Sequence, residues 1–219
     1  MNQIQSIEDL IPGKKYMHTG SYGPSGSGKS YKSVQEMKAW DGPGIYFNDP
    51  RKPSDDYSIP GRKFSSKTDP KKIRKALRNG EMIRFKPSSD VDKAINQLRL
   101  MYVIAKDTHG QVPFWIDECH RFNGKTLSTI LDDGRGHQVH FGLITQYPKR
   151  LKDGSQYGTY VLQTIEDTGI WCIFDVSIKQ QGFFDYYGYD YDKIAEATDN
   201  QYGFVVMEGN DMIAGPLQA

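Results

Sequence analysis

The sequence predicts an α/β fold of the P-loop NTPase type, in which a mostly parallel sheet carries helices on both faces. Three observations support this prediction. The segment "GPSGSGKS", from Gly23 to Ser30, has the G-x-x-x-x-G-K-[ST] spacing of a phosphate-binding loop. Short apolar stretches alternate along the chain with segments of helical periodicity, as in strand–helix–strand units. These apolar stretches are nearly continuous, which is typical of parallel strands buried on both faces.

The composition agrees with one globular domain. The chain has 219 residues, of which 37% are hydrophobic and 25% charged, enough for one α/β core. We therefore expect a single P-loop domain over residues 1–219, with a basic insert at about residues 50–80. No run of about 18 apolar residues is present, so no membrane span is expected, and the polar N-terminus does not resemble a signal peptide. Cys119 and Cys172 lie in apolar stretches and are expected to be reduced core residues of an intracellular protein.

The phosphate-binding loop lies between a predicted strand and a predicted helix. "KYMHTG" (15–20) precedes it, and "KSYKSVQEMKAW" (29–40) follows with apolar residues at helical spacing. In this context backbone N–H groups of the loop and the helix N-terminus would surround phosphates of ATP. Lys29 would reach the β- and γ-phosphates and Ser30 would hold Mg²⁺. A flexible Gly/Ser loop is the alternative. The cofactor-binding residues predicted here are Gly23, Pro24, Ser25, Gly26, Ser27, Gly28, Lys29 and Ser30.

A basic segment follows the next predicted strand, "GIYFND" (44–49). Residues 50–70 form a Pro/Ser/Lys-rich stretch that predicts a long loop, and "KKIRKALRNG" (71–80) predicts a short basic helix ending at Gly80. Residues 50–80 carry ten Lys and Arg against three Asp and Glu, a balance of +7, so the rest of the chain sums to −6. Such a concentration favours contact with a polyanion. A solvated, lysine-rich surface explains it equally well.

The rest of the chain continues the alternation of strands and helices. The longest predicted helix begins after a Ser89 or Asp90 cap and has one apolar face from Val91 to Ala105. The aromatic stretch "GFFDYYGYDYD" (182–192) is expected to pack against the sheet or a neighbouring subunit rather than to bind a base. Strands are predicted at 82–87, 112–119, 139–146, 169–174 and 202–208, and helices at 125–133 and 191–198.

Two acidic residues end the predicted strand "VPFWIDEC" (112–119). Ligands of a parallel α/β sheet bind at the carboxyl ends of the strands, and neighbouring residues of a strand point to opposite faces. We therefore expect Asp117 to bind Mg²⁺ and Glu118 to orient or deprotonate the attacking water. An N-cap for the next helix is the alternative. A carboxylate after the metal-binding aspartate favours hydrolases and motors over small-molecule kinases.

Two further candidate residues lie at the two ends of the next predicted strand, 139–146. Gln146 ends "LITQ" and can hydrogen-bond the γ-phosphate or the attacking water, or be an ordinary strand-end cap. Arg135, beside two glycines before that strand, is expected on an exposed turn near the carboxyl edge of the sheet. Its planar charge suits transition-state stabilisation across a subunit boundary. A surface ion pair with Asp132 or Asp133 is the alternative.

The stretch "GRGHQVHFGLITQYP" (134–148) resembles the G-R-x-x-G-I-H-hydrophobic-x-A-T-Q-x-P pattern of the FtsK–HerA superfamily of DNA-pumping ATPases. Gln138 departs from the pattern, because the family often has glycine there. "PFWIDECHRF" and "GIWCIFDVS" resemble two strands of the same family, so three short blocks carry a resemblance that covers roughly residues 14–208. The positions in matching register are Arg135, His140, Thr145, Gln146 and Pro148.

The resemblance implies a RecA/FtsK-like ATPase with ATP and Mg²⁺ as cofactors, assembled as a homo-oligomeric ring, with a hexamer favoured. In that superfamily the arginine matching Arg135 serves a neighbouring subunit. The small size and the lack of a membrane span are most similar to the genome-packaging ATPases of tailless, membrane-containing icosahedral viruses. This implies double-stranded DNA as partner, docking at a capsid vertex or on a membrane protein, and a location in the host cytoplasm and the virion.

Three other functions remain open at this level. Zonular-occludens-toxin-like assembly proteins of filamentous phages share the opening "GSGKSYxxV", here Gly26 to Val34, but export single-stranded DNA and usually carry a membrane segment. A nucleotide kinase could use "SIPGRKFSSKTDPKKIRK" as a basic lid, although Glu118 and Gln146 argue against it. A nucleotide-dependent structural switch with negligible turnover is the weakest alternative.

Overall fold

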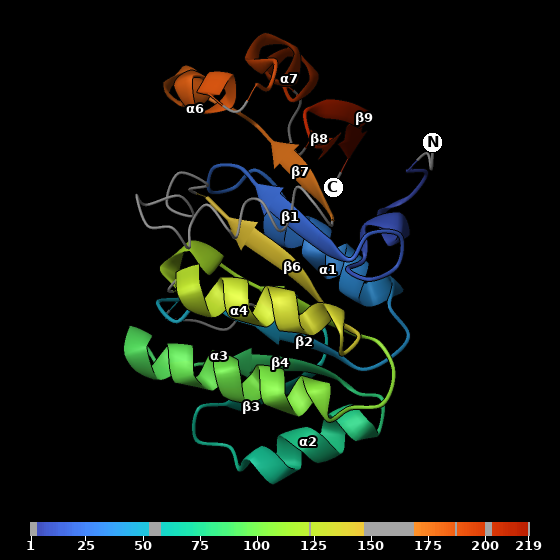
Figure 1. Cartoon of the computed structure of the whole chain (residues 1–219), viewed down its shortest axis with the longest axis vertical. Helices are drawn as coiled ribbons and strands as arrows, with labels where there is room; N and C mark the ends of the chain where they lie inside the picture. The colour runs from blue at the N-terminus through green and yellow to red at the C-terminus, as the bar shows by residue number, and fades with distance from the viewer. Residues whose placement is uncertain are drawn as a thin grey trace.

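The computed structural model describes residues 4–52, 58–122, 124–146, 169–186, 188–199 and 203–218. Nine strands of this part of the chain form one sheet, in the order β3-β4-β2-β5-β6-β1-β7-β8-β9 (Figure 1). Every pairing from β3 to β7 is parallel, and the last two pairings are antiparallel. The prediction of a mostly parallel sheet is therefore confirmed. The strands are β1 (His18–Tyr22), β2 (Gly44–Phe47), β3 (Arg62–Ser65), β4 (Met82–Lys86), β5 (Val112–Ile116), β6 (Val139–Thr145), β7 (Gly169–Phe174), β8 (Gly203–Glu208) and β9 (Asp211–Gln218).

Helices cover both faces of the sheet, as predicted. In Figure 1, α2, α3 and α4 lie in front of the sheet, α1 lies behind it, and α6 and α7 lie beyond its upper end. The helices are α1 (Lys29–Ala39), α2 (Pro70–Arg78), α3 (Val91–Lys106), α4 (Gly124–Arg135), α6 (Gln181–Tyr186) and α7 (Tyr191–Ala197), with 3₁₀ turns η1 (Ile7–Leu10), η2 (Cys119–Arg121) and η4 (Ile178–Gln180).

The core is split by the sheet because successive strand residues point to opposite faces. On β5, Phe114 and Ile116 belong to the large cluster under α2, α3 and α4, whereas Trp115 belongs to the cluster under α1. Helix α1 is fixed to β5 by a buried network. Lys32 Nζ lies 2.5 Å from Glu36 Oε1, and Trp115 Nε1 donates to Glu36 Oε2 at 2.8 Å. This network holds the helix that follows the phosphate-binding loop.

Local capping explains where the front helices begin. Asp69 accepts a hydrogen bond from Lys71 N at 2.9 Å, and Pro70 occupies the first turn of α2, where its missing N–H costs nothing. Asp90 caps α3 through Asp92 N and Lys93 N. Both helices therefore begin within a residue or two of the positions that the sequence predicted.

Two predictions about the sheet were incomplete. Residues 50–70 are not wholly a loop, because β3 lies within them and pairs with β4 as the edge strand. The sequence also did not predict β9, which pairs antiparallel with β8. The aromatic stretch 182–192 packs as expected: Phe184, Tyr189 and Tyr191 are buried in the large cluster. Cys119 and Cys172 are buried free cysteines.

Candidate nucleotide-binding site

The predicted phosphate-binding loop joins the end of β1 directly to α1. Gly28 is the N-cap of α1 and has φ 105°, a conformation that favours glycine. A Cβ atom at Gly23 would lie 2.7 Å from Phe174 Cβ and 2.7 Å from Ser27 Oγ, so a side chain there would collide with the neighbouring strand. Gly28 is therefore required by its backbone conformation, and Gly23 by the lack of space for a side chain.

Lys29 lies inside the loop rather than in solvent. Its Nζ donates to Pro24 O at 2.6 Å, and the residue is 5% exposed. Burial lowers the pKa of Lys29 to about 8, although Glu118 and Asp117 oppose this shift. Ser27 Oγ is buried and has no hydrogen-bond partner in the described part of the chain. The Lys29 ammonium, held by one loop carbonyl, and the unsatisfied Ser27 hydroxyl are groups that could bind a phosphate.

The strand order brings the other predicted site residues to this loop. Strands β5, β6 and β1 are adjacent and parallel, so their carboxyl ends meet at one edge of the sheet. Gly23 N donates to Thr145 O at 3.4 Å, which joins the loop to the end of β6. The next residue is Gln146. The site is thus made from the ends of three strands, as expected for ligands of parallel α/β sheets.

Asp117 follows β5 and is almost completely buried, with 1% exposure. Its N–H donates to Phe47 O at 2.9 Å, and its Oδ2 lies 2.8 Å from Lys52 Nζ. Burial raises the pKa of the Asp117 carboxyl, and the Lys52 ammonium opposes this rise. Carboxylate and hydroxyl oxygens are the ligand types that Mg²⁺ takes beside phosphates. Asp117 and Ser30 are therefore suitable ligands.

Glu118 has an unusual backbone conformation. Its φ of 49° is left-handed, which is uncommon and strained for a residue other than glycine. The sequence predicted that Asp117 and Glu118 diverge as neighbours on a strand. The structure corrects this, because β5 ends at Ile116 and both acids lie in the turn that follows, where Glu118 is left-handed.

The Glu118 carboxylate is held by two side chains. Gln146 Nε2 donates to Oε1, and His120 Nδ1 lies 3.1 Å from Oε2. Burial alone would raise the pKa of Glu118, but His120 and Gln146 hold it below its ordinary value. An ionised carboxylate oriented by an amide can accept a proton from water. The structure thus brings Glu118 and Gln146 together, a contact that the sequence analysis did not predict.

Two residues of this cluster were missed by the sequence analysis. His120 Nδ1 also lies 3.1 Å from Thr145 Oγ1, so it links Glu118 to the end of β6. Its place two residues after Glu118 was the available signal. Lys52 belongs to the basic segment, and nothing in its local sequence indicates contact with Asp117, which is 65 residues away.

Arg135 lies away from this cluster. It is exposed, as predicted, but it is the last residue of α4 rather than part of a turn, and β6 begins at Val139, four residues later. The predicted position near the carboxyl edge is therefore wrong: Arg135 lies at the amino edge. Its Nη2 is 3.7 Å from Asp132 Oδ1. Gln138, in the turn that follows, has φ 57°, which explains why glycine is suited to that position. Pro148 lies outside the described residues.

Comparisons with known proteins agree with the fold. No protein-family model matches the sequence, and no curated protein matches it significantly. Among solved structures, the chain is similar to the genome-packaging NTPase B204 from Sulfolobus turreted icosahedral virus 2 in complex with ATP-gammaS. That match has 16% identity and a TM-score of 0.59, and covers 94% of this chain and 95% of that chain.

Two other solved structures give the same result. The DNA-packaging ATPase B204 from Sulfolobus Turreted Icosahedral Virus matches with 16% identity and a TM-score of 0.62, over 88% of this chain and 92% of that chain. VirB4 of Thermoanaerobacter pseudethanolicus matches with 10% identity and a TM-score of 0.68, over 99% and 93%. These similarities confirm the predicted α/β P-loop NTPase fold. Among the described helices, none is both long and apolar enough to cross a membrane.

Proposed function

We propose that the protein is a Mg²⁺-dependent ATPase whose hydrolysis cycle drives double-stranded DNA through a homo-oligomeric ring. The observation that carries this proposal is the grouping of Lys29, Asp117 and the Glu118–Gln146 pair at one edge of the sheet. A site that only binds phosphate does not need an ionised carboxylate oriented by an amide. A hydrolase does, because an attacking water must be positioned and must lose a proton.

Each residue of the site has a distinct task in this proposal. The loop N–H groups and Lys29 bind the phosphates, and Asp117 and Ser30 hold the metal, which supplies charge that stabilises the transferring phosphoryl group. Glu118 accepts the proton of the attacking water. Gln146 orients the Glu118 carboxylate and hydrogen-bonds the water or the terminal phosphate.

Ring assembly is part of the proposal because of Arg135. The nucleotide site lies at the carboxyl edge and Arg135 at the amino edge, so Arg135 cannot serve the site of its own subunit. A head-to-tail ring, with a hexamer favoured, would bring this arginine to the neighbour's nucleotide. The names of the B204 neighbours, a genome-packaging NTPase and a DNA-packaging ATPase, support a packaging role. That role implies docking at a capsid vertex or on a membrane protein, and a location in the host cytoplasm and the virion.

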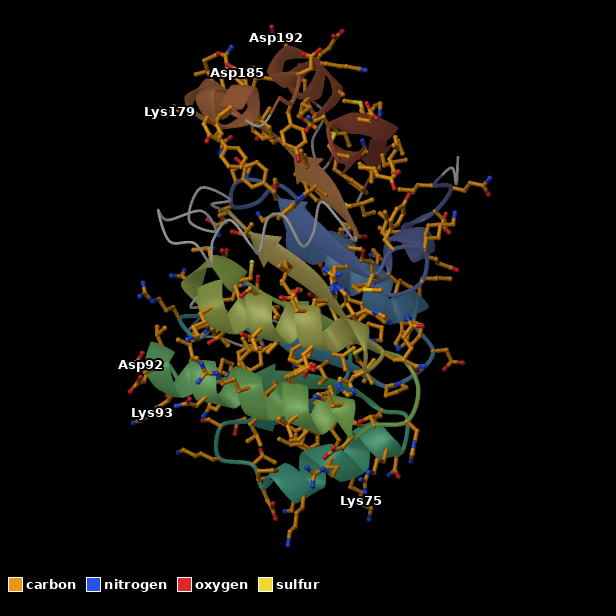
Figure 2. The ribbon with its side chains drawn as sticks, in the orientation of Figure 1. Lys75, Asp92, Lys93, Lys179, Asp185 and Asp192 are labelled. Carbon is orange, nitrogen blue, oxygen red and sulfur yellow. The ribbon has the colours of Figure 1, made fainter. Side chains whose placement is uncertain are left out.

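The basic segment offers a surface for DNA. Helix α2 buries Ile73, Ala76 and Leu77 against the core and leaves its cations outside, and Lys75 points outward at the end of the molecule (Figure 2). Five strand spacings separate β3 from β1, roughly 24 Å. This surface is thus distinct from the nucleotide site. Its exposed cations are Arg62, Lys63, Lys67, Lys71, Lys72, Lys75 and Arg78.

Two alternatives differ from this proposal in the molecule on which the protein acts. A phage-assembly ATPase would act on single-stranded DNA, so binding to single- and double-stranded DNA of one length distinguishes it. A nucleotide kinase would transfer the phosphate to an acceptor. The ionised and oriented Glu118 favours transfer to water.

The test is phosphate release from Mg-ATP without any acceptor. Lys29→Ala is expected to abolish nucleotide binding. Glu118→Gln is expected to keep binding and to lower turnover by about 10²- to 10⁴-fold, the usual contribution of a positioned base. Hydrolysis at the wild-type rate by Glu118→Gln would refute the assigned role. No phosphate release by the wild-type protein, with or without DNA, would refute the ATPase proposal.

A further inference from the structure

Lys52 is held in place by a turn at the end of β2. Lys52 N donates to Asp49 O at 3.2 Å, and Arg51 N donates to Asp49 Oδ1 at 2.9 Å. Asp49 is itself buried, and its Oδ1 lies 2.9 Å from Arg121 Nε. The turn is thus fixed to the chain that follows Glu118. Its geometry directs the Lys52 side chain to the nucleotide site.

The Lys52 side chain crosses from solvent to the buried carboxylate. Its Nζ lies 2.8 Å from Asp117 Oδ2, and its side chain is 39% exposed against 2% for that of Asp117. Burial lowers the pKa of Lys52, but the Asp117 carboxylate outweighs this and raises it. Its charge also contributes to the lowered pKa of Lys29. Two ammonium groups therefore influence each other at this edge of the sheet.

The contact conflicts with the metal-binding task of Asp117. A carboxylate oxygen that holds an ammonium at 2.8 Å is not free to bind a divalent cation or its water shell at the same time. Lysine is a compact charge on a flexible four-carbon stem, so Lys52 can move while its backbone stays in the turn. When a metal ion binds to Asp117, it displaces the Lys52 ammonium. The nearest anionic groups would then be the nucleotide phosphates that bind together with the metal.

We propose that Lys52 is a second phosphate-contacting lysine, which exchanges Asp117 for the terminal phosphate when Mg-ATP binds. This inference rests on the proposed nucleotide site and adds a residue to it. In this arrangement Lys52 keeps Asp117 neutralised before the metal arrives and then discriminates ATP from ADP, because only ATP offers the terminal phosphate. The ammonium thereby remains paired in both situations, which avoids the cost of an unpaired charge beside a buried carboxylate.

The test compares a non-hydrolysable ATP analogue with ADP in equilibrium binding, using fluorescent nucleotides and Mg²⁺. Lys52→Met is expected to weaken binding of the ATP analogue by about ten- to hundredfold, the value of a hydrogen bond to a charged group. At saturating Mg²⁺, ADP affinity should change by less than about twofold. Lys52→Arg should keep most of the preference for ATP. Lys38→Met, a change at an exposed lysine on α1, is the matched control.

A second readout separates phosphate contact from mere charge balance. The Mg²⁺ concentration needed for half-maximal ADP binding should fall in Lys52→Met, because Asp117 has lost its competing cation. In the wild-type protein, the Mg-bound ATP analogue should protect Lys52 from acetylation, measured by mass spectrometry, whereas Mg-ADP should not. This labelling needs no variant, so it holds even if Lys52→Met fails to fold.

The outcomes are distinguishable. Equal losses for both nucleotides, an unchanged Mg²⁺ requirement, or equal protection by both nucleotides would overturn the role of Lys52 and leave the ATPase proposal intact. No nucleotide binding by the wild-type protein would overturn both proposals.

Discussion

Replacing Arg135 by alanine tests whether the nucleotide site is completed by a second subunit. Arg135 ends α4 at the amino edge of the sheet, and Gln146 follows β6 at the carboxyl edge. The seven residues of β6 span about 20 Å at a rise of ~3.3 Å per residue. An arginine side chain cannot cover that distance within its own subunit. Arg135→Ala is therefore expected to bind ATP with wild-type affinity.

The two interpretations of Arg135 predict effects of very different size. If Arg135 stabilises the transition state at a neighbouring site, its loss should lower turnover by about 10³-fold or more. If it serves only the surface ion pair with Asp132 at 3.7 Å, its loss should cost about 0–1 kcal/mol of stability and leave turnover unchanged. Asp132→Ala removes the same ion pair but keeps the arginine. It is the matched control and should retain wild-type turnover.

The assay is phosphate release by mixed subunits. Arg135→Ala and Lys29→Ala proteins are each expected to be inactive, and mixing them should restore activity. Mixed rings contain interfaces with an intact loop on one side and an intact arginine on the other. Subunit exchange must be shown first, for example by energy transfer between labelled subunits. If subunits exchange and no activity returns, Arg135 does not act across an interface.

Three further measurements follow from the structure. His18 is fully buried, and burial lowers its pKa to about 3. The unfolded chain takes up a proton at this histidine below pH ~6.5, whereas the folded protein does not. The free energy of unfolding should therefore fall by about 2 kcal/mol from pH 7 to pH 5. Urea unfolding should show this loss, and His18→Asn should lack it; an equal loss in both proteins would refute the assignment. Gln146→Ala should lower turnover about ten- to hundredfold at unchanged nucleotide affinity, and a loss of affinity instead would make it a binding residue. Neutralising Lys71, Lys72 and Lys75 on α2 together should reduce the slope of log affinity for DNA against log salt concentration by up to about 3. An unchanged slope would place the DNA contact elsewhere.

Local sequence was sufficient for the phosphate-binding loop and for most of the elements. Gly23 to Ser30 are consecutive in the chain, so their spacing does not depend on the tertiary fold. The loop, its glycines and the helix that follows are therefore specified within about a dozen residues. Asp117, Glu118 and Gln146 could also be placed, because a residue that ends a parallel strand lies at the carboxyl edge whatever the strand order. The contact between Glu118 and Gln146 depends in addition on the pairing of β5 with β6.

The edge on which Arg135 lies depends on a helix boundary. The glycines beside it indicated a turn, but α4 continues through Gly134 to Arg135, and Leu131 and Gly134 on the inner side of its last turns are buried. Helix ends are decided by such packing more than by local propensity. Tertiary packing also explains β3: the Pro/Ser/Lys-rich stretch around it indicated a loop, but the strand pairs with β4.

The sequence by itself determined that this protein has a phosphate-binding loop, two acidic residues after a buried strand and a polar amide after the next. Each of these follows from neighbours in the chain and from the period of the strands. Only the tertiary structure decided that Lys52 reaches Asp117, that His120 and Gln146 hold Glu118, and that Arg135 lies at the edge of the sheet opposite its own site. Those relations join residues from separate elements, and no local pattern records them, because strand order and turn geometry set the distances between them.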